Sequence, residues 1–150
     1  MIKIQQNDFD AGNEIAQLSG SGSQVGAIVS FVGTVREFSS NGKLVSMNLE
    51  HYPIMTQKSL EKIVKQAKSR WGIEEVRLIH RVGCLFPADQ IVFVGVSSMH
   101  RGQAFMACEF IMDFLKTGAP LWKKENFETG AKWVDECEGD IEALRRWEQS

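Results

Sequence analysis

The stretch Ile91-Val-Phe-Val-Gly-Val-Ser-Ser98 is followed, after a short junction, by a second apolar segment over Gln103–Lys116. An apolar run of strand length that is rich in Val and Phe predicts a strand buried inside the protein. In the second segment apolar residues recur at helical spacing and spread around most of the girth, which predicts a deeply packed helix. Gly118 and Pro120 predict the end of that helix. A buried strand and a buried helix therefore form the centre of the expected fold.

The chain around this centre supplies more strands and a second long helix. Helices are expected over Ala11–Leu18, from Pro53 to Gly72, and from Asp140 onward. Strands are expected over Ile2–Gln5, Val25–Arg36, Leu44–His51 and Val76–Arg81, with a hairpin over Leu121–Val134. Because the strands occur in groups with two main helices between them, the sequence predicts the α+β class with a mixed or antiparallel sheet.

The length and composition are those of one ordinary domain. The chain has 150 residues, of which 43% are hydrophobic and 24% charged, the balance of a soluble globular protein. We expect residues 1–150 to form a single domain, with residues 136–150 as a loosely ordered tail. No apolar run is long enough to span a membrane, and the N-terminus lacks the features of an export signal. We therefore expect a cytoplasmic protein.

Motifs for metal binding, redox chemistry or covalent catalysis are missing from the sequence. The three cysteines form no CxxC pair and are odd in number, which fits free thiols in a reducing compartment: Cys84, Cys108 and Cys137. The three histidines lack metal-ligand spacing, with or without Cys84, so we expect no metal and no cofactor: His51, His80 and His100. No GxSxG motif is present, and no cysteine has an evident activating partner. If the protein is an enzyme, a substrate must therefore supply the nucleophile.

Positive charge is concentrated in one part of a mildly acidic chain. The formal net charge is -2, which argues against a binder of nucleic acid or another polyanion. Between His100 and Lys124, however, the basic residues outnumber the acidic ones. A local cationic stretch in an acidic protein suits a small anionic ligand.

The two ends of the expected buried helix carry candidate anion-binding residues. The junction Ser97-Ser-Met-His-Arg101 closes the strand and opens the helix, where backbone N–H groups point outward and favour anions. His100 and Arg101 add donors and positive charge there. Lys116 stands at the other end, where a helix C-terminus favours a cation. Two interpretations of Lys116 are therefore equally supported: it interacts favourably with the helix dipole, or it is part of a binding site.

Two further segments carry basic residues in less specific surroundings. In an extended segment, alternation places Lys123 on one face and Lys124, with Trp122, on the other, so that one lysine faces solvent and the other a cleft. Arg36 ends a strand that contains Gly33, a residue that permits close approach of a ligand. A solvated strand-end arginine is the ordinary reading of Arg36, and an anion contact is the alternative.

Five segments in order closely resemble the MoaE family, the large catalytic subunits of molybdopterin synthases. The segments are Phe31-Val-Gly-Thr-Val-Arg36, Leu49-Glu-His-Tyr-Pro53, His80-Arg-Val-Gly83, His100-Arg101 and Phe110-Ile-Met-Asp-Phe-Leu-Lys-Thr-Gly-Ala-Pro-Leu-Trp-Lys-Lys-Glu125. The likeness spans roughly residues 25–135, and its most specific part is the Leu-Lys-Thr-x-Ala-Pro-x-Trp-Lys pattern. The resemblance implies an α/β-hammerhead fold within the α+β class.

The resemblance also implies an activity and an assembly. Members of this family are sulfurtransferases of molybdenum cofactor biosynthesis. Sulfur passes from the C-terminal thiocarboxylate of a small ubiquitin-like carrier, the MoaD type with a Gly-Gly tail, to cyclic pyranopterin monophosphate, and two transfers build the molybdopterin dithiolene. Two catalytic subunits pair as a homodimer and each binds one carrier, which makes a heterotetramer. The carrier would then be the substrate that supplies the nucleophile.

Matching the family motif residue by residue assigns roles to two lysines. Lys116 is expected nearest the carrier's tail, where it orients the thiocarboxylate. Lys123 is expected beside the pterin, where it protonates a leaving oxygen, a role that requires a lowered pKa. The other matched residues are expected to bind substrate, partly across the subunit boundary: Thr34, Val35, Arg36, His100, Arg101, Lys124 and Glu125.

One position departs from the family pattern, and two other functions remain open. Gly118 stands where relatives often carry a larger, basic residue, and we expect it to alter only the rim of the site. A non-catalytic module that binds a ubiquitin-like carrier is the main alternative. A different transferase acting on a small anion is the second. Because this sequence contains both Lys116 and Lys123, it does not look like a family member that has lost catalytic activity.

Overall fold

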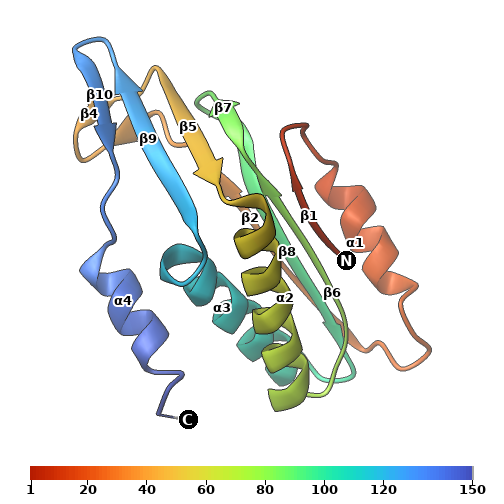
Figure 1. Cartoon of the computed structure of the whole chain (residues 1–150). Helices are drawn as coiled ribbons and strands as arrows, with labels where there is room; N and C mark the ends of the chain where they lie inside the picture. Colours follow the sequence, from red (N-terminus) through yellow and green to blue (C-terminus); the bar gives the residue numbers. More distant parts are fainter. Residues whose placement is uncertain (150) are drawn as a thin grey trace.

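The computed structural model describes residues 1–149, which form two four-stranded sheets, a two-stranded ribbon and four helices (Figure 1). The first sheet contains, in spatial order, β1 (Ile2–Gln5), β6 (Ile73–Arg81), β8 (Gln90–Ser98) and β2 (Ala27–Thr34). The second sheet contains β10 (Gly130–Trp133), β9 (Leu121–Phe127), β5 (Ser46–His51) and β7 (Gly83–Leu85). The ribbon joins β3 (Phe38–Ser39) to β4 (Gly42–Lys43), and the helices are α1 (Ala11–Ser19), α2 (Pro53–Arg70), α3 (Arg101–Thr117) and α4 (Glu138–Arg145).

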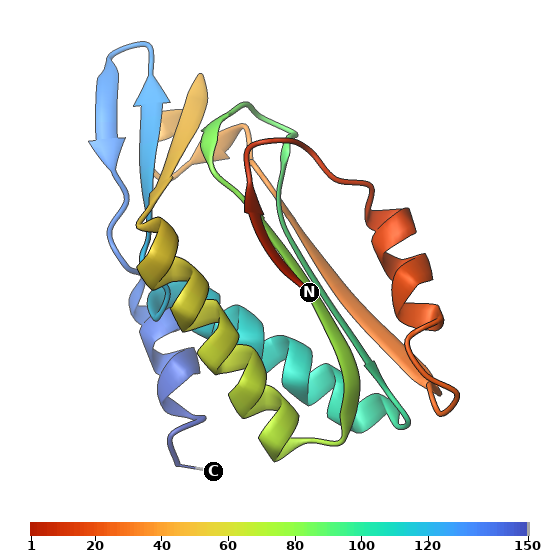
Figure 2. The same ribbon diagram turned by 45° about the vertical axis from the view of Figure 1, so that its right-hand side comes forward.

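Strand β8 is the centre of the first sheet and is buried on both faces. Helices α2 and α3 cover one face, and α1 covers the other (Figure 2). Val94 and Val96 of β8 join a large core cluster that includes Ile111 of α3, whereas Phe93 joins Leu18 of α1 in a smaller cluster. Alternate side chains of one strand thus feed two separate cores. The predicted burial of this strand is confirmed.

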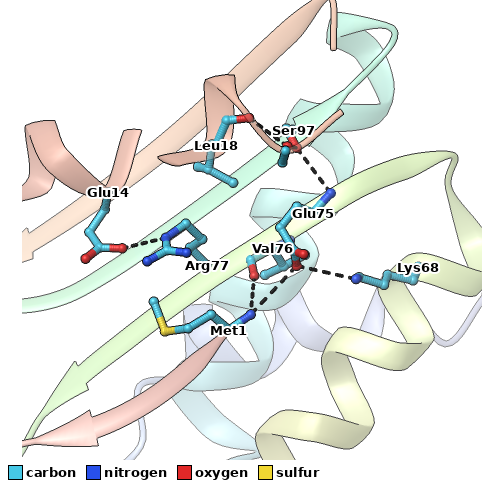
Figure 3. Close-up of polar contacts among 9 residues, drawn as sticks. Met1, Glu14, Leu18, Lys68, Glu75, Val76, Arg77 and Ser97 are labelled. Atoms are coloured by element: carbon cyan, nitrogen blue, oxygen red, sulfur yellow. Dashed lines mark hydrogen bonds and ion pairs between the residues drawn. The ribbon is translucent and has the colours of Figure 1, made fainter. Parts of the chain in front are cut away.

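Helix α1 lies close to the first sheet because β8 has a glycine beneath it. A Cβ atom at Gly95 would overlap the Leu18 side chain and lie 2.8 Å from the Phe93 ring. The helix is also fastened by an ion pair, in which Arg77 Nε donates to Glu14 Oε2 at 2.6 Å (Figure 3). The neighbouring strand β1 is held at its start, where the Met1 ammonium donates to the carbonyl of Val76 at 2.8 Å (Figure 3).

The predicted α+β class with a mixed sheet and two main helices is confirmed. The strands, however, divide between two sheets, and several strands begin or end at other residues than the sequence predicted. Pairing is parallel between β1 and β6 and antiparallel elsewhere. The predicted strand ending at Arg36 stops at Thr34, because Val35 exchanges hydrogen bonds with the 88–89 turn instead of β8. The predicted strand beginning at Leu44 starts at Ser46, and the expected polar turn over Glu37–Lys43 contains the ribbon β3–β4.

The C-terminal segment packs against α3. Helix α4 begins at Glu138, earlier than the expected Asp140, and its end is anchored by Trp147, which is buried. The Trp147 ring centroid lies 5.5 Å from that of Phe110 in an edge-to-face arrangement, and its indole nitrogen donates to the Asp113 carboxylate at 2.7 Å. Ser150, the end of the expected tail, lies outside the described residues.

Membrane crossing by a helix is not indicated. Over residues 1–149, every helix is too short or too polar to traverse a bilayer.

We expect Gly95→Ala to lower the free energy of unfolding by about 1–3 kcal/mol, because the added methyl group must push Leu18 and α1 away from β8. Urea denaturation would measure this loss. Gly102→Ala is the matched control: Gly102 lies in α3 with open space around it, so alanine should raise stability by about 0.5–1 kcal/mol. Equal stability of the two variants would contradict the close packing of α1.

Candidate active site

The two lysines singled out by the sequence are joined by a short, fixed turn. Lys116 lies in the last turn of α3 and is exposed, and Lys123 lies in β9. Between them the Gly118 N–H bonds to the carbonyl of Phe114 at 2.7 Å, which ends the helix. The hydroxyl of Thr56 in α2 then donates to the carbonyl of Pro120 at 2.9 Å. The turn is thereby tied to a second helix, which fixes the direction in which β9 leaves α3.

The pairing register of β9 decides which lysine faces inward. Lys123 stands opposite Leu49 of β5 and shares its face with Glu125. Lys124 is on the other face, where its ammonium lies 5.7 Å from the centroid of the Trp133 ring. The predicted separation of the two lysines is confirmed. Lys124 rests against an aromatic ring on the opposite side of the sheet from Lys123.

Lys123 is largely buried among other cations, and its pKa is lowered from 10.5 to about 8. Burial is the largest cause, because the charged form loses its hydration. The positive charge of Lys116 comes next, and that of Arg36 acts in the same direction, so both lie within electrostatic range of Lys123. The carboxylates of Asp140 and Glu125 oppose the shift. A lysine with a pKa near ambient pH can both give and take a proton.

Two acidic residues limit the net charge around Lys123. Glu125 is 5% exposed on the same face of β9, and Asp140 comes from α4. Both carboxylates raise the pKa of Lys123 and so favour its ammonium form. The sequence matched Glu125 to the family motif, but no pattern in the sequence indicated Asp140.

A buried histidine adjoins these groups. His80 is the next-to-last residue of β6 and is 5% exposed. Its Nδ1 lies 2.8 Å from the carbonyl oxygen of Arg81. The pKa of His80 is lowered to about 4, mainly because burial disfavours the charged ring; the hydrogen bond to Arg81 opposes the shift, and the nearby charges of Lys123 and Lys116 add to it. We call Lys116, Lys123, Arg36, Glu125 and His80 together the lysine site. In the sequence, His80 stands out only as a histidine without metal-ligand spacing at the start of one family segment, and no pattern gives it a part in the site.

The residues that precede Arg36 turn the chain toward the lysine site. Thr34 is the last residue of β2 and is exposed, whereas Val35 is buried. The Val35 N–H bonds to the carbonyl of Asp89, and the Val35 carbonyl accepts from the N–H of Ala88, both at 2.9 Å. Anchoring Val35 in this way leaves the exposed side chains of Thr34 and Arg36 free to contact a ligand.

Metal ligands are not gathered at the site. Across residues 1–149, histidine, cysteine and carboxylate side chains nowhere form a group of three that could hold a metal ion. The cysteines are free; Cys84 and Cys137 are exposed, and Cys108 is buried in α3. Burial raises the pKa of the Cys108 thiol to about 12, so this cysteine is not a thiolate nucleophile at neutral pH.

Comparison with known proteins identifies the family. The family model described as "MoaE protein" matches residues 4–118, most of the chain. The chain belongs to the MoaE protein family. A relative from Ralstonia nicotianae, named molybdopterin synthase catalytic subunit, is 53% identical over 146 residues, which are 97% of this chain and 83% of the relative.

Solved structures of MoaE proteins share the fold. A molybdopterin biosynthesis MoaE protein from Burkholderia ambifaria has a TM-score of 0.84 and 50% identity, over 99% of this chain and 97% of that one. A chain from Helicobacter pylori, solved as a protein–protein complex of subunits 1 and 2 of molybdopterin-converting factor, has a TM-score of 0.74 at 22% identity, over 90% of each chain. That second likeness concerns the fold alone.

In this MoaE protein the sequence-predicted site residues fall into two groups. Arg36, Lys116, Lys123 and Glu125 meet at the lysine site. His100 and Arg101 are exposed at the opposite end of α3. The fifteen helical steps from Arg101 to Lys116 correspond to about 22 Å along a rigid axis. One chain therefore does not bring all the predicted residues together.

We expect the buried His80 to weaken the fold in acid. Its pKa is about 4 in the folded chain and near 6.5 when exposed, so between these pH values only the unfolded chain takes up the proton. The free energy of unfolding should fall as the pH falls through this window, by up to about 3 kcal/mol. Urea denaturation of the wild type and of His80→Gln between pH 4 and 7 would measure it. The variant should lose this part of the pH dependence, and parallel curves would contradict the burial of a neutral imidazole.

Proposed function

We propose that this chain is the sulfur-transferring subunit of a molybdopterin synthase. It would pass sulfur from the C-terminal thiocarboxylate of a small ubiquitin-like carrier to cyclic pyranopterin monophosphate. The observation that carries the proposal is the electrostatic coupling of an exposed lysine, Lys116, to a partly buried one, Lys123, whose pKa is lowered, in a chain of the MoaE family. The free cysteines fit the reducing cytoplasm, where we place the reaction.

The electrostatics of the lysine site suit two negatively charged reactants. A thiocarboxylate and a phosphorylated pterin repel each other in water, and cations in a partly dehydrated site reduce that repulsion. Lys116 is exposed, so a peptide tail that arrives from outside can reach its ammonium. We assign Lys116 to orienting the thiocarboxylate and stabilising oxyanion charge.

Lys123 has the properties of a general acid for the same reaction. When the carrier's sulfur bonds to a carbon of the pterin precursor, the oxygen that leaves that carbon needs a proton. A lysine with an ordinary pKa holds its proton too tightly, whereas the Lys123 ammonium, with a pKa of about 8, can release it. Glu125, buried on the same face, would help to restore the ammonium form for the second transfer.

The source of sulfur follows from the state of the cysteines. A persulfide mechanism needs a reactive thiolate, and the pKa of the buried Cys108 is raised to about 12. Cys84, in β7, is exposed and pairs with Asn48 across the strand ladder. A carrier that brings its own thiocarboxylate requires neither thiol.

We infer that the substrate site is completed by a second copy of this chain. His100 and Arg101 lie about 22 Å from Lys116 along α3, too far to hold the phosphate of a pterin that reacts at the lysine site. In a homodimer, the same residues of the partner can reach it. Thr34, Arg36 and Glu125 would contribute from the chain that holds the lysine pair, with Val35 contributing through its backbone; Lys124 faces the other side of the sheet, so its predicted contact would need a substrate or carrier segment that reaches around β9.

Replacing either lysine should stop sulfur transfer without unfolding the protein. We expect Lys116→Ala and Lys123→Ala each to lower the rate of dithiolene formation by about 100-fold or more, because each removes charge that the transition state needs. The assay combines purified protein, thiocarboxylated carrier and cyclic pyranopterin monophosphate. Lys62→Ala, on the exposed side of α2, is the matched control and should keep full activity.

Normal turnover by Lys116→Ala would refute the assignment. If the wild-type protein binds the carrier but forms no dithiolene, the result would instead favour the non-catalytic carrier-binding module.

Mixing two inactive variants tests the shared site. In a dimer of one Lys116→Ala subunit and one Arg101→Ala subunit, one site has both residues intact and the other has neither. After exchange of equal amounts of the two homodimers, we expect about a quarter of wild-type activity, because half of the dimers are mixed and each has one working site. Each homodimer alone is the control. Activity that stays at the level of the separate variants would show that both residues act within one chain.

A further inference from the structure

One face of α3 carries two acidic residues before Lys116, and α4 lies along that face. Glu109, Asp113 and Lys116 follow one another at intervals of four and three residues, so their side chains share one side of the helix. Helix α4 packs beside the C-terminal half of α3 (Figure 2). A long side chain in a helix leans back toward the preceding turn, which brings Lys116 toward Asp113. These two residues have the ordinary spacing of an ion pair within a helix.

The Asp113 carboxylate is nevertheless occupied by two donors from the end of the chain. Its Oδ2 accepts from the indole nitrogen of Trp147 at 2.7 Å and from Arg146 Nη2 at 2.9 Å. Arg146 also pairs with Glu109, one turn earlier on the same face. Lys116 forms no ion pair with any carboxylate of residues 1–149, and its side chain is exposed. The acidic residue closest to it along this face is therefore engaged elsewhere.

Aromatic packing holds these two donors in place. The ring centroid of Trp147 lies 5.6 Å from that of Trp71 and 5.5 Å from that of Phe110, both edge to face. The Trp147 carbonyl accepts from Arg70 Nη1 at 3.0 Å, and the guanidinium of Arg146 lies 5.0 Å from the centroid of the Trp147 ring. Because the indole is buried and packed on two rings, its N–H stays directed at α3.

We propose that Arg146 and Trp147 are positioning residues for Lys116: by holding the Asp113 carboxylate, they keep the Lys116 ammonium available to an anionic reactant. A released Asp113 would compete with a thiocarboxylate for the ammonium and would also repel it. Only 17% of the Asp113 side chain is exposed, so water screens its charge less than at an open surface. The value of this arrangement for sulfur transfer rests on the proposed function, whereas the unpaired state of Lys116 does not.

Acetylation of Lys116 by acetic anhydride reports the state of its ammonium without any turnover. Mass spectrometry gives its rate relative to Lys62, which is exposed on α2. In the double variant Arg146→Ala/Trp147→Phe, Asp113 is released, and we expect Lys116 to react about 2- to 5-fold more slowly, because an ion pair favours the unreactive protonated amine. Adding Asp113→Asn should restore the wild-type rate. A rate that is unchanged or faster in the double variant would overturn the proposal.

Sulfur transfer by the same variants tests the functional consequence. We expect the double variant to lose about 3- to 10-fold in kcat/KM for the thiocarboxylated carrier, and Asp113→Asn to return most of that loss. Glu109→Gln is the matched control, because it removes another carboxylate that Arg146 binds, but two turns away from Lys116. It should not restore activity. Trp147→Phe alone keeps a ring in the aromatic cluster and should show a smaller loss, which Asp113→Asn again reverses.

The rescue separates positioning from structural support. If the activity lost by a variant with a wild-type circular dichroism spectrum is not returned by Asp113→Asn, or is returned equally by Glu109→Gln, the positioning role is overturned. A wild type that makes no dithiolene would overturn the proposed function and leave the acetylation result standing.

Discussion

Burial of β8 on both faces is the constraint from which the rest of the structure follows. An apolar strand of this kind needs cover on each side, and α1 and the pair α2–α3 provide it. Since α3 begins directly after β8, its packing on the strand fixes where the helix ends. Lys116 stands at that end, and the turn to β9 is held against α2 by Thr56. The position of the lysine pair is therefore a consequence of how the core is filled.

Charge at the lysine site is controlled by competition between dehydration and ion pairing. Burial and the neighbouring cations Lys116 and Arg36 lower the pKa of Lys123, while Glu125 and Asp140 limit the shift. The balance leaves the pKa of Lys123 at about 8, where the side chain can both hold and release a proton near neutral pH. Asp140 belongs to α4, which is anchored on α3 by Trp147. The C-terminal helix thus contributes to the chemistry of a residue in a distant strand.

The length of α3 has a separate consequence. A helix is a rigid rod, so the cations at its two ends cannot approach each other in one chain. Each end nevertheless suits an anion, for different reasons. The N-terminal end offers free N–H groups together with His100 and Arg101, and the C-terminal end brings Lys116 beside a buried second lysine. A second copy of the chain is the simplest way to use both ends on one substrate.

Four properties of the protein can be predicted from the amino-acid sequence: the α+β class, the buried strand and helix, the separation of Lys123 from Lys124 and, through the motifs, the family. These properties depend on the spacing of apolar residues along strands and helices and on the order of residues within short motifs, both of which can be read directly from the sequence. Four other properties appear only in the folded chain: the division into two sheets, the end of β2 at Thr34, the influence of Asp140 on Lys123 and the burial of His80 within range of the lysine charges. The physical reason is that pKa shifts and hydrogen-bond geometry depend on which groups meet in space, and here they come from β5, β6, β9, α3 and α4. His80, a histidine without a distinctive pattern in the sequence, becomes a buried group with a lowered pKa only when those elements close around it.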